Sequence, residues 1–359
     1  MRTALVSRLA AWAYLRPSRT VEDRIVFLGG AMTGNLSAYA AHLARNSPTT
    51  ELAYLTSHPT PGPLPTPGRL LRPWRWRDLK VVARSRAVIS AQGPRSLRPW
   101  LESEHRPLFV DVWHGVGFKS RVVTAHPAFR DYDAHFVSSP HVAEFYRAAG
   151  AHPQVTGYAR MDALGEPPDP TVRARIDALF PHTSGPLVLY APTWGLGGPA
   201  PRDVVAVLAR SLGESARIAF RPHARLHVES DVDRGVGVID QRAVPHAADL
   251  LPFVDVLVTD WSSIATDYLP LQRPVVYLDV PPPVVDAGPL TRDDRPGPIV
   301  ADLDELVAAV REAIHDPDAA TAPFATARSA TVERAWGDTL DGRSRDRYDA
   351  ALAALERRT

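Results

Sequence analysis

Short, mainly apolar runs recur along the chain, and stretches long enough for a helix separate them. In the first half they cover residues 24–28, 87–90, 108–112 and 134–137. In the second half they cover residues 187–190, 217–220, 236–239, 254–259 and 275–278. Such runs, alternating with helical segments, are typical of parallel strands joined by helical crossovers. The pattern therefore predicts an α/β protein built from two Rossmann-like βαβ halves.

The chain is longer than one hydrophobic core usually organises, with 359 residues. Its proline-rich stretch at residues 166–170 is the natural linker between the halves. We expect an N-terminal segment at 1–20, a first domain at 21–165, a second at 166–320 and a C-terminal helical segment at 321–359. The carboxyl ends of the two sheets are expected to face each other across a cleft, where ligands of such folds bind.

The N-terminal segment places Leu5, Leu9 and Trp12 at helical spacing among several arginines. An amphipathic basic helix of this kind suits an anionic membrane surface, although a helix packed on the first domain gives the same pattern. The apolar stretch at residues 9–15 is about half as long as a membrane span requires. We expect no transmembrane helix there and no secretory signal.

Prolines interrupt the chain most densely at residues 59–73, which excludes a helix or a central strand and predicts an extended surface loop. The run Trp74-Arg75-Trp76-Arg77 follows. Its alternating aromatic and guanidinium groups fit either contact with phosphates and lipid headgroups or tryptophans packed on the domain.

Charge and composition narrow the classes of function. The chain has 41 basic and 40 acidic residues, so no overall field draws it to nucleic acid. With no cysteine, it has no disulfide, thiolate nucleophile or cysteine-bound zinc. Nothing in the sequence indicates a cofactor or a metal, although a divalent cation stays open, and the charged run at residues 292–295 is expected to be a solvated, charge-balanced loop.

One candidate base follows the apolar run at residues 108–112, in Trp113-His114-Gly115. A strand's carboxyl end faces the ligand in α/β sheets, and histidine accepts protons near neutral pH. Gly115 would let the backbone approach a substrate. Position alone favours neither a catalytic nor a purely structural role for His114.

In the second half, Arg221-Pro222-His223 closes another strand. The arginine fork suits phosphate oxygens, and His223 can donate a hydrogen bond or a proton to a leaving phosphate. Such a pair taken alone is more often a surface ion-pair site.

Two further turns leave strands in this half. Ser262 or Ser263 is a natural N-cap for a helix whose free amides can bind an anion, but capping alone would also explain a serine there. Thr193, in Tyr190-Ala191-Pro192-Thr193-Trp194, can bond to phosphate.

Taken in order, these segments resemble the CDP-glycerol glycerophosphotransferases, the teichoic-acid primases and polymerases with a GT-B fold. The matching segments are Trp113-His114-Gly115 with Lys119, residues 157–162, residues 190–194, Arg221-Pro222-His223 and residues 249–267 with Asp260, Ser262, Ser263 and Asp267. Weaker matches are Pro296-Gly297-Pro298, Asp341-Gly342 and Arg347. The chain departs from the family at Trp261, where a tyrosine is usual, and at Gly195, where an arginine is usual.

The resemblance implies transfer of glycerol phosphate, or a related polyol phosphate, from CDP-glycerol to a hydroxyl of a lipid-linked or polymeric acceptor, with release of CMP. His114 is implied as the base, on the acceptor side, and His223 as the group assisting the donor diphosphate. The implied donor-binding residues of the second domain, with Gly115, are Thr193, Arg221, Asp260, Ser262, Ser263 and Asp267. The enzyme is expected in the cytoplasm, with peripheral attachment to the inner face of the membrane as an option.

Three alternatives stay open. A GT-B glycosyltransferase uses the same two-domain cleft for a nucleotide sugar, because a fold does not fix a function. A non-catalytic nucleotide-binding protein would keep the strand-end residues only for binding. A nucleotide-sugar epimerase shares the fold but normally needs carboxylates placed for proton abstraction from carbon, and no such pair is evident.

Overall fold

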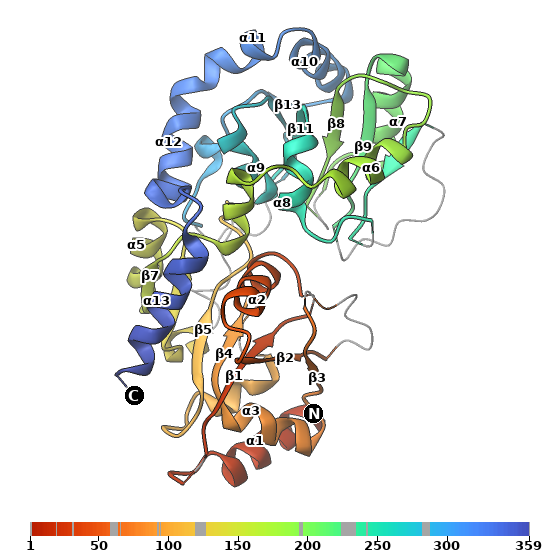
Figure 1. Ribbon diagram of the computed structural model, residues 1–359. Helices are drawn as coiled ribbons and strands as arrows, with labels where there is room; N and C mark the ends of the chain where they lie inside the picture. Colours follow the sequence, from red (N-terminus) through yellow and green to blue (C-terminus); the bar gives the residue numbers. More distant parts are fainter. Residues whose placement is uncertain are drawn as a thin grey trace. The chain divides into compact units, whose positions relative to one another are not determined.

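The structure is a computed structural model that describes residues 2–18, 20–30, 32–57, 64, 66–91, 93, 95–118, 127–193, 197–223, 235–241, 243–281 and 288–358. The chain forms two compact units (Figure 1). The first contains Met1–His114, Arg121–Asp162 and Trp336–Thr359, and the second contains Gly115–Ser120 and Ala163–Ala335. Lys119, Trp194 and Gly195 lie outside the described residues.

The first unit is built on a seven-stranded sheet in the order β3-β2-β1-β4-β5-β6-β7, and every pair of neighbours is parallel. The strands are β1 (Glu22–Leu28), β2 (Glu51–Leu55), β3 (Arg69–Leu71), β4 (Ser85–Ser90), β5 (Leu108–Asp111), β6 (Ala134–Val137) and β7 (Pro153–Val155). The strands are added on one side of β1 up to β3 and then on its other side from β4 onward, so the strand order reverses between β1 and β4, as in Rossmann folds.

Helices cover both faces of this sheet. They are α1 (Arg2–Tyr14), α2 (Asn35–Asn46), α3 (Trp76–Arg84), α5 (Pro140–Ala148) and α13 (Ser344–Glu356). Side chains alternate along β1, so Ile25 and Phe27 join one core cluster with α2 and α13, whereas Val26 and Leu28 join the other with α1 and α3. The C-terminal helix therefore completes the core of the first unit.

Helix α1 packs on the first unit, which is the alternative that its sequence pattern left open. Ser7 and Ala10 are fully buried, and the carbonyl of Ser7 accepts a hydrogen bond from the indole of Trp100 at 3.0 Å. The large apolar side chains of Leu5, Leu9 and Trp12 instead point to solvent. Among the residues that the structure describes, no helix is long and apolar enough to cross a membrane.

The second unit has a six-stranded parallel sheet in the order β10-β9-β8-β11-β12-β13. Its strands are β8 (Leu187–Tyr190), β9 (Arg217–Phe220), β10 (Val236–Val238), β11 (Val256–Thr259), β12 (Val275–Leu278) and β13 (Ile299–Val300). Its helices are α6 (Pro170–Ala178), α7 (Pro201–Leu212), α8 (Ala247–Leu250), α9 (Ile264–Tyr268), α10 (Leu303–His315), α11 (Pro317–Thr321) and α12 (Ala325–Trp336), the last of which ends at the first residue of the next segment of the first unit.

The predicted α/β class with two Rossmann-like sheets is confirmed. One expectation needs correction. Within the proline-rich stretch at residues 59–73, Arg69–Leu71 forms strand β3 rather than a loop. The strand is tolerated because it lies at the edge of the sheet and pairs only with β2, so few backbone donors are needed.

Candidate functional site

The turn that carries His114 begins where β5 ends and is strained. The backbone of Val112 still donates to Ser90 at 2.7 Å, and Trp113 then adopts a φ of 37°. Bulky residues rarely occupy this left-handed region, and such conformations cluster at functional sites. The indole of Trp113 lies against the imidazole of His114, with the ring centroids 4.1 Å apart.

The His114 side chain is exposed, and a hydrogen bond to the backbone helps to orient its ring. Its Nδ1 lies 3.0 Å from the carbonyl oxygen of Ala91, the residue after β4. A carbonyl can only accept, so Nδ1 carries the proton and donates it to this bond. In the neutral ring, Nε2 is therefore the nitrogen with the basic lone pair.

Asn35, the first residue of α2, holds this turn in place and was missed by the sequence interpretation. Its buried amide nitrogen donates to the carbonyl of Val112 at 2.7 Å and to that of Trp113 at 3.0 Å. Its amide oxygen accepts from the backbone nitrogen of Arg160 at 3.3 Å and from Nη1 of the same residue at 3.2 Å. The available signal was a polar residue opening a helix directly after the glycine-rich loop at residues 29–34.

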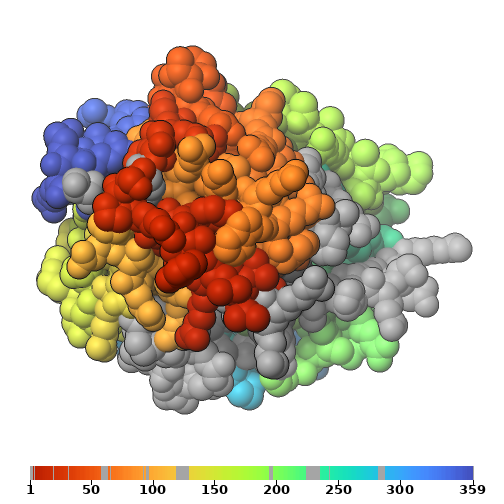
Figure 2. All heavy atoms as spheres, turned by 90° about the horizontal axis from the view of Figure 1, so that it is seen from below, coloured from red at the N-terminus to blue at the C-terminus, as the bar shows by residue number. Residues whose placement is uncertain are grey.

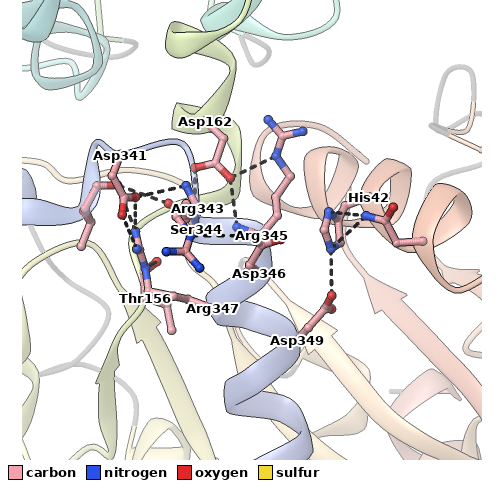
Figure 3. Close-up of polar contacts among 12 residues, drawn as sticks. His42, Thr156, Asp162, Asp341, Arg343, Ser344, Arg345, Asp346, Arg347 and Asp349 are labelled. Atoms are coloured by element: carbon pink, nitrogen blue, oxygen red, sulfur yellow. Dashed lines mark hydrogen bonds and ion pairs between the residues drawn. The ribbon is translucent and has the colours of Figure 1, made fainter.

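The segment at residues 157–162 anchors the C-terminal helix, and Figure 3 shows the contacts of Asp162, the last residue of the segment. The Asp162 carboxylate accepts from the backbone nitrogens of Ser344 and Arg345 at 3.0 and 2.9 Å and pairs with the Arg345 side chain. Gly157 has a φ of 77°, and a β-carbon on it would lie 2.3 Å from the Ser344 hydroxyl. These family-like positions hold α13 on the first sheet.

In the second unit, Gly115 and Val116 are bound to the start of α9. A β-carbon on Gly115 would lie 2.6 Å from the Ser263 hydroxyl, so glycine is needed for this close approach. The hydroxyl of Thr266 donates to the carbonyl of Val116 at 2.7 Å and is also 2.7 Å from that of Ser263. The residue after His114 is therefore packed directly against Ser263.

Thr193 and Asp260 meet at the carboxyl ends of the neighbouring strands β8 and β11. The backbone nitrogen of Thr193 donates to both carboxylate oxygens of Asp260 at 2.9 Å. The hydroxyl of Thr193 is buried and has no hydrogen-bond partner in the described part of the chain. A buried hydroxyl without a partner is uncommon and is a candidate for contact with a ligand.

Ser263 occupies the N-cap position of α9, but its side chain makes no capping hydrogen bond. The predicted N-cap position is therefore confirmed for Ser263, but a capping hydrogen bond does not account for its side chain. Ser262 is half-buried, and Asp267 is buried one turn into α9, with its backbone nitrogen 3.4 Å from the carbonyl of Ser263.

Arg221 is buried just past β9 and is partly engaged with the backbone. Its Nη1 donates to the carbonyls of Ile239 at 3.3 Å and Val244 at 3.0 Å. Burial lowers the pKa of Arg221 to about 10, and the negative charges of Asp240 and Asp249 oppose this shift. The guanidinium stays charged at neutral pH, while His223 follows two residues later and is half-buried.

The charged run at residues 292–295 is not the solvated loop expected from its composition. Asp294 is buried and pairs with Arg334, and Arg295 is buried beside the indole of Trp261. Arg292 remains exposed and pairs with Asp279 at 3.0 Å. Asp294, Arg295 and Arg292 thus lie in three different environments, which the balance of charges in the sequence did not predict.

Comparison with known proteins places the chain in a family. Residues 14–349 match the family described as CDP-glycerol:poly(glycerophosphate) glycerophosphotransferase. The comparison with curated proteins found no match.

Among solved structures, one of the wall teichoic acid polymerase TagF, a variant soaked with CDPG, has a TM-score of 0.77 at 17% identity and covers 99% of this chain and 94% of its own. Another TagF structure has a TM-score of 0.76 at 15% identity, covering 98% of this chain and 94% of its own. A putative UDP-N-acetylglucosamine 2-epimerase from Listeria monocytogenes has a TM-score of 0.58 at 13% identity, covering 95% and 97%.

These structures share the GT-B-like fold, which is confirmed for this chain, and the family match extends over nearly the whole sequence. It confirms the enzyme class expected from the motifs, a transferase of glycerol phosphate from CDP-glycerol. The chain belongs to the CDP-glycerol:poly(glycerophosphate) glycerophosphotransferase family.

Proposed function

We propose that His114 is the general base of this glycerophosphotransferase. The observation that carries the proposal is the 3.0 Å contact between His114 Nδ1 and the carbonyl of Ala91. It keeps the proton on Nδ1 and directs the basic character to Nε2 of an exposed ring. The strained Trp113 and the hydrogen bonds from Asn35 support the same role, because they hold the turn in one geometry.

In the proposed reaction, Nε2 of His114 takes the proton of an acceptor hydroxyl as its oxygen attacks the β-phosphorus of CDP-glycerol. A new phosphorus–oxygen bond forms to the acceptor, and the bond from that phosphorus to the CMP oxygen breaks. CMP leaves, and His223 is proposed to donate a hydrogen bond or a proton to the leaving phosphate. Atoms and charge balance without a cofactor.

The donor is proposed to bind at the carboxyl edge of the second sheet. The supporting observations are the contact between Gly115 and Ser263 and the unpartnered hydroxyl of Thr193 beside Asp260. Arg221 stays charged and retains guanidinium nitrogens beyond Nη1 for phosphate oxygens. The remaining proposed donor contacts are Ser262, Ser263, Asp260 and Asp267.

The acceptor is proposed to be a lipid-linked saccharide or a polyol phosphate polymer, in the synthesis of teichoic acid or a related cell-surface polymer. The structural likeness to a wall teichoic acid polymerase fits this proposal. Such an acceptor is held at a membrane, so the enzyme needs a means of reaching one.

A membrane-contacting face on the first unit would meet that need, and we call this face the α1 face. It contains the exposed side chains of Leu5, Leu9, Trp12, Trp74 and Trp76, with exposed arginines among them. Figure 2 views the molecule from below, where α1 is red and the orange segment around α3 lies next to it. Tryptophans with neighbouring cations are typical of interfacial binding, so we propose peripheral attachment at the cytoplasmic side of the membrane.

A donor panel tests the reaction. The purified protein is incubated with a lipid-diphosphate saccharide acceptor and with CDP-glycerol, CDP-ribitol or UDP-sugars, and both nucleotide release and product mass are measured. CMP release together with a mass gain of one glycerol phosphate is expected. Sugar transfer without CMP release would favour a glycosyltransferase and reject the proposed reaction.

A further inference from the structure

Arg295 is a buried cation for which the described residues supply no hydrogen-bond partner. Its side chain is 3% exposed, and its Nε, Nη1 and Nη2 atoms are buried and make no hydrogen bond within the described residues. Its Cζ atom lies 4.1 Å from the ring centroid of Trp261 and 5.6 Å from that of Tyr277. The aromatic faces attract the charge but supply no acceptor for five N–H groups.

The carboxylates nearest to Arg295 are committed elsewhere. Asp279 pairs with Arg292 at 3.0 Å, and Asp294 pairs with Arg334 and accepts from Thr291. Burial lowers the pKa of Arg295, and the nearby negative charge of Asp260 opposes this shift. The Asp260 carboxylate itself accepts hydrogen bonds from the backbone nitrogen of Thr193. An unpaired buried charge costs folding free energy, and a bound anion would offset that cost.

A second buried donor contacts the same short segment, Asp260-Trp261, as Arg295 does. The unpartnered hydroxyl of Thr193 belongs to the residue whose backbone holds Asp260, and Trp261, the residue after Asp260, contacts Arg295. The hydroxyl of Tyr277 is also buried without a partner in the part of the chain that is described. A ligand with several oxygen acceptors satisfies such a group of donors, and a planar guanidinium matches two oxygens of one phosphate.

We propose that Arg295 and Thr193 form a binding site for a phosphate oxyanion. Arg295 then supplies a second guanidinium for phosphate in this unit, in addition to the partly engaged Arg221. Only the source of the phosphate rests on the proposed function: a donor diphosphate or an acceptor phosphodiester carries the same oxyanion. The usual tyrosine of the family is Trp261 here, and the larger ring is the face on which Arg295 stacks.

Calorimetric titration of the whole protein tests the site without turnover. Inorganic pyrophosphate, CDP-glycerol, cytidine and glycerol 3-phosphate are titrated into the wild type, R295M and the control R292M. The R295M change should weaken pyrophosphate and CDP-glycerol binding by roughly 10- to 100-fold, the effect of losing a charged hydrogen bond, and leave cytidine binding unchanged. R292M, which removes an exposed guanidinium three residues away, should stay within about twofold.

The arms of the titration separate the two sources. Weakening confined to glycerol 3-phosphate supports the site and assigns it to an acceptor phosphate. If pyrophosphate binds and R295M weakens its binding, while CDP-glycerol does not bind, the phosphate site is supported and the proposed donor is rejected. Equal affinities in R295M and the wild type overturn the inference, as does a wild type that binds none of the phosphate compounds.

If R295M does not fold, R295Q is titrated in the same way. A crystal structure of the wild-type protein with pyrophosphate gives a check that needs no variant. A phosphate oxygen within hydrogen-bond distance of the Arg295 guanidinium is expected. Pyrophosphate bound elsewhere, with Arg295 still unpaired, overturns the inference.

Discussion

Gly115 and Ser263 are packed so closely that a β-carbon on the glycine would lie 2.6 Å from the serine hydroxyl and 2.9 Å from its Cβ. Gly115 directly follows His114 in the chain, so a loop that moves to relieve this contact is expected to disturb the backbone next to the proposed base. A change at either residue is therefore expected to affect more than local packing.

The G115A substitution tests this contact. The added methyl group should force Ser263 or the loop backbone to move, lowering the free energy of unfolding by about 1–3 kcal/mol and the rate of CMP release by more than roughly tenfold. Thermal unfolding and a CMP-release assay measure the two effects. In the double variant G115A/S263G, which removes the clashing side chain, stability should recover relative to G115A.

A matched control is G165A, because no atom lies within 4 Å of a β-carbon built on Gly165. It should leave both measurements near those of the wild type. A G115A protein as stable as G165A would mean that the close approach to Ser263 does not constrain the loop.

Asn35 is expected to act as a positioning residue for His114. In N35D, a carboxylate replaces the amide that donates to the carbonyls of Val112 and Trp113. Loss of these bonds should reduce kcat by roughly 10- to 100-fold while donor affinity stays within about threefold, because the donor residues lie elsewhere. Steady-state kinetics, donor titration and the pH profile of kcat measure the separate effects.

The exposed Asn46 at the other end of α2 provides the control variant N46D. It should retain the wild-type kcat. If N35D lowers stability and donor affinity together and leaves the pH profile of kcat unchanged, its role is structural and does not involve His114.

Acid stability should depend on the pair formed by Asp341 and Arg347. The guanidinium contacts both carboxylate oxygens, at 2.8 and 2.9 Å, and lowers the pKa of Asp341 to about 2 (Figure 3). Because the folded-state pKa is below the ordinary value of 3.8, the stabilisation is complete above that pH and is lost as the pH falls toward 2. The D341N protein lacks this contribution throughout.

The melting temperatures of wild type and D341N should therefore converge as the pH is lowered from about 5 to about 2.5. The D346N variant is the control, because the pair between Asp346 and Arg343 is long, at 3.9 Å, and so should contribute little. Parallel curves for wild type and D341N across this range would show that the ion pair does not stabilise the C-terminal helix.

The α1 face should bind vesicles that contain anionic lipids. Trp12 is 76% exposed, with the Arg16 guanidinium 5.3 Å from its ring, so W12S removes an amphipathic anchor without opening the core. Co-sedimentation with such vesicles should fall several-fold in W12S, and V155S, at an exposed apolar position on β7, should bind like the wild type. Equal binding by all three proteins would reject the α1 face as a membrane contact.

Mainly apolar runs predicted most of the parallel strands, because strands covered on both faces consist largely of apolar residues. β6, β8, β9 and β12 begin and end where the runs do. The prediction missed β2, β3, β7 and β13. Three of these, β3, β7 and β13, lie at sheet edges, where a strand needs few apolar residues or backbone donors, and the neighbourhood of β3 is also rich in proline. The last helix gave no sign of packing on the first sheet, since only the fold brings Tyr348 beside Tyr39.

Strand-end motifs indicated the residues of the candidate site, but local sequence could not predict partners distant in the chain. His114 and Ser263 were visible as motif residues, whereas Asn35 acts through hydrogen bonds to residues 77 and 78 positions away. Arg295 was misinterpreted because equal charges in sequence suggest mutual neutralisation. In the fold, its acidic neighbour Asp294 pairs with Arg334 instead.

The most direct measurement is CMP release from CDP-glycerol by H114A in the presence of a lipid-diphosphate acceptor, alongside donor affinity. Removal of a general base should lower kcat by roughly 10²- to 10⁴-fold, while CDP-glycerol affinity stays within a few-fold of the wild type. H315A, at an exposed histidine on α10, should keep full activity. Wild-type kcat in H114A would contradict the role of His114 as the base.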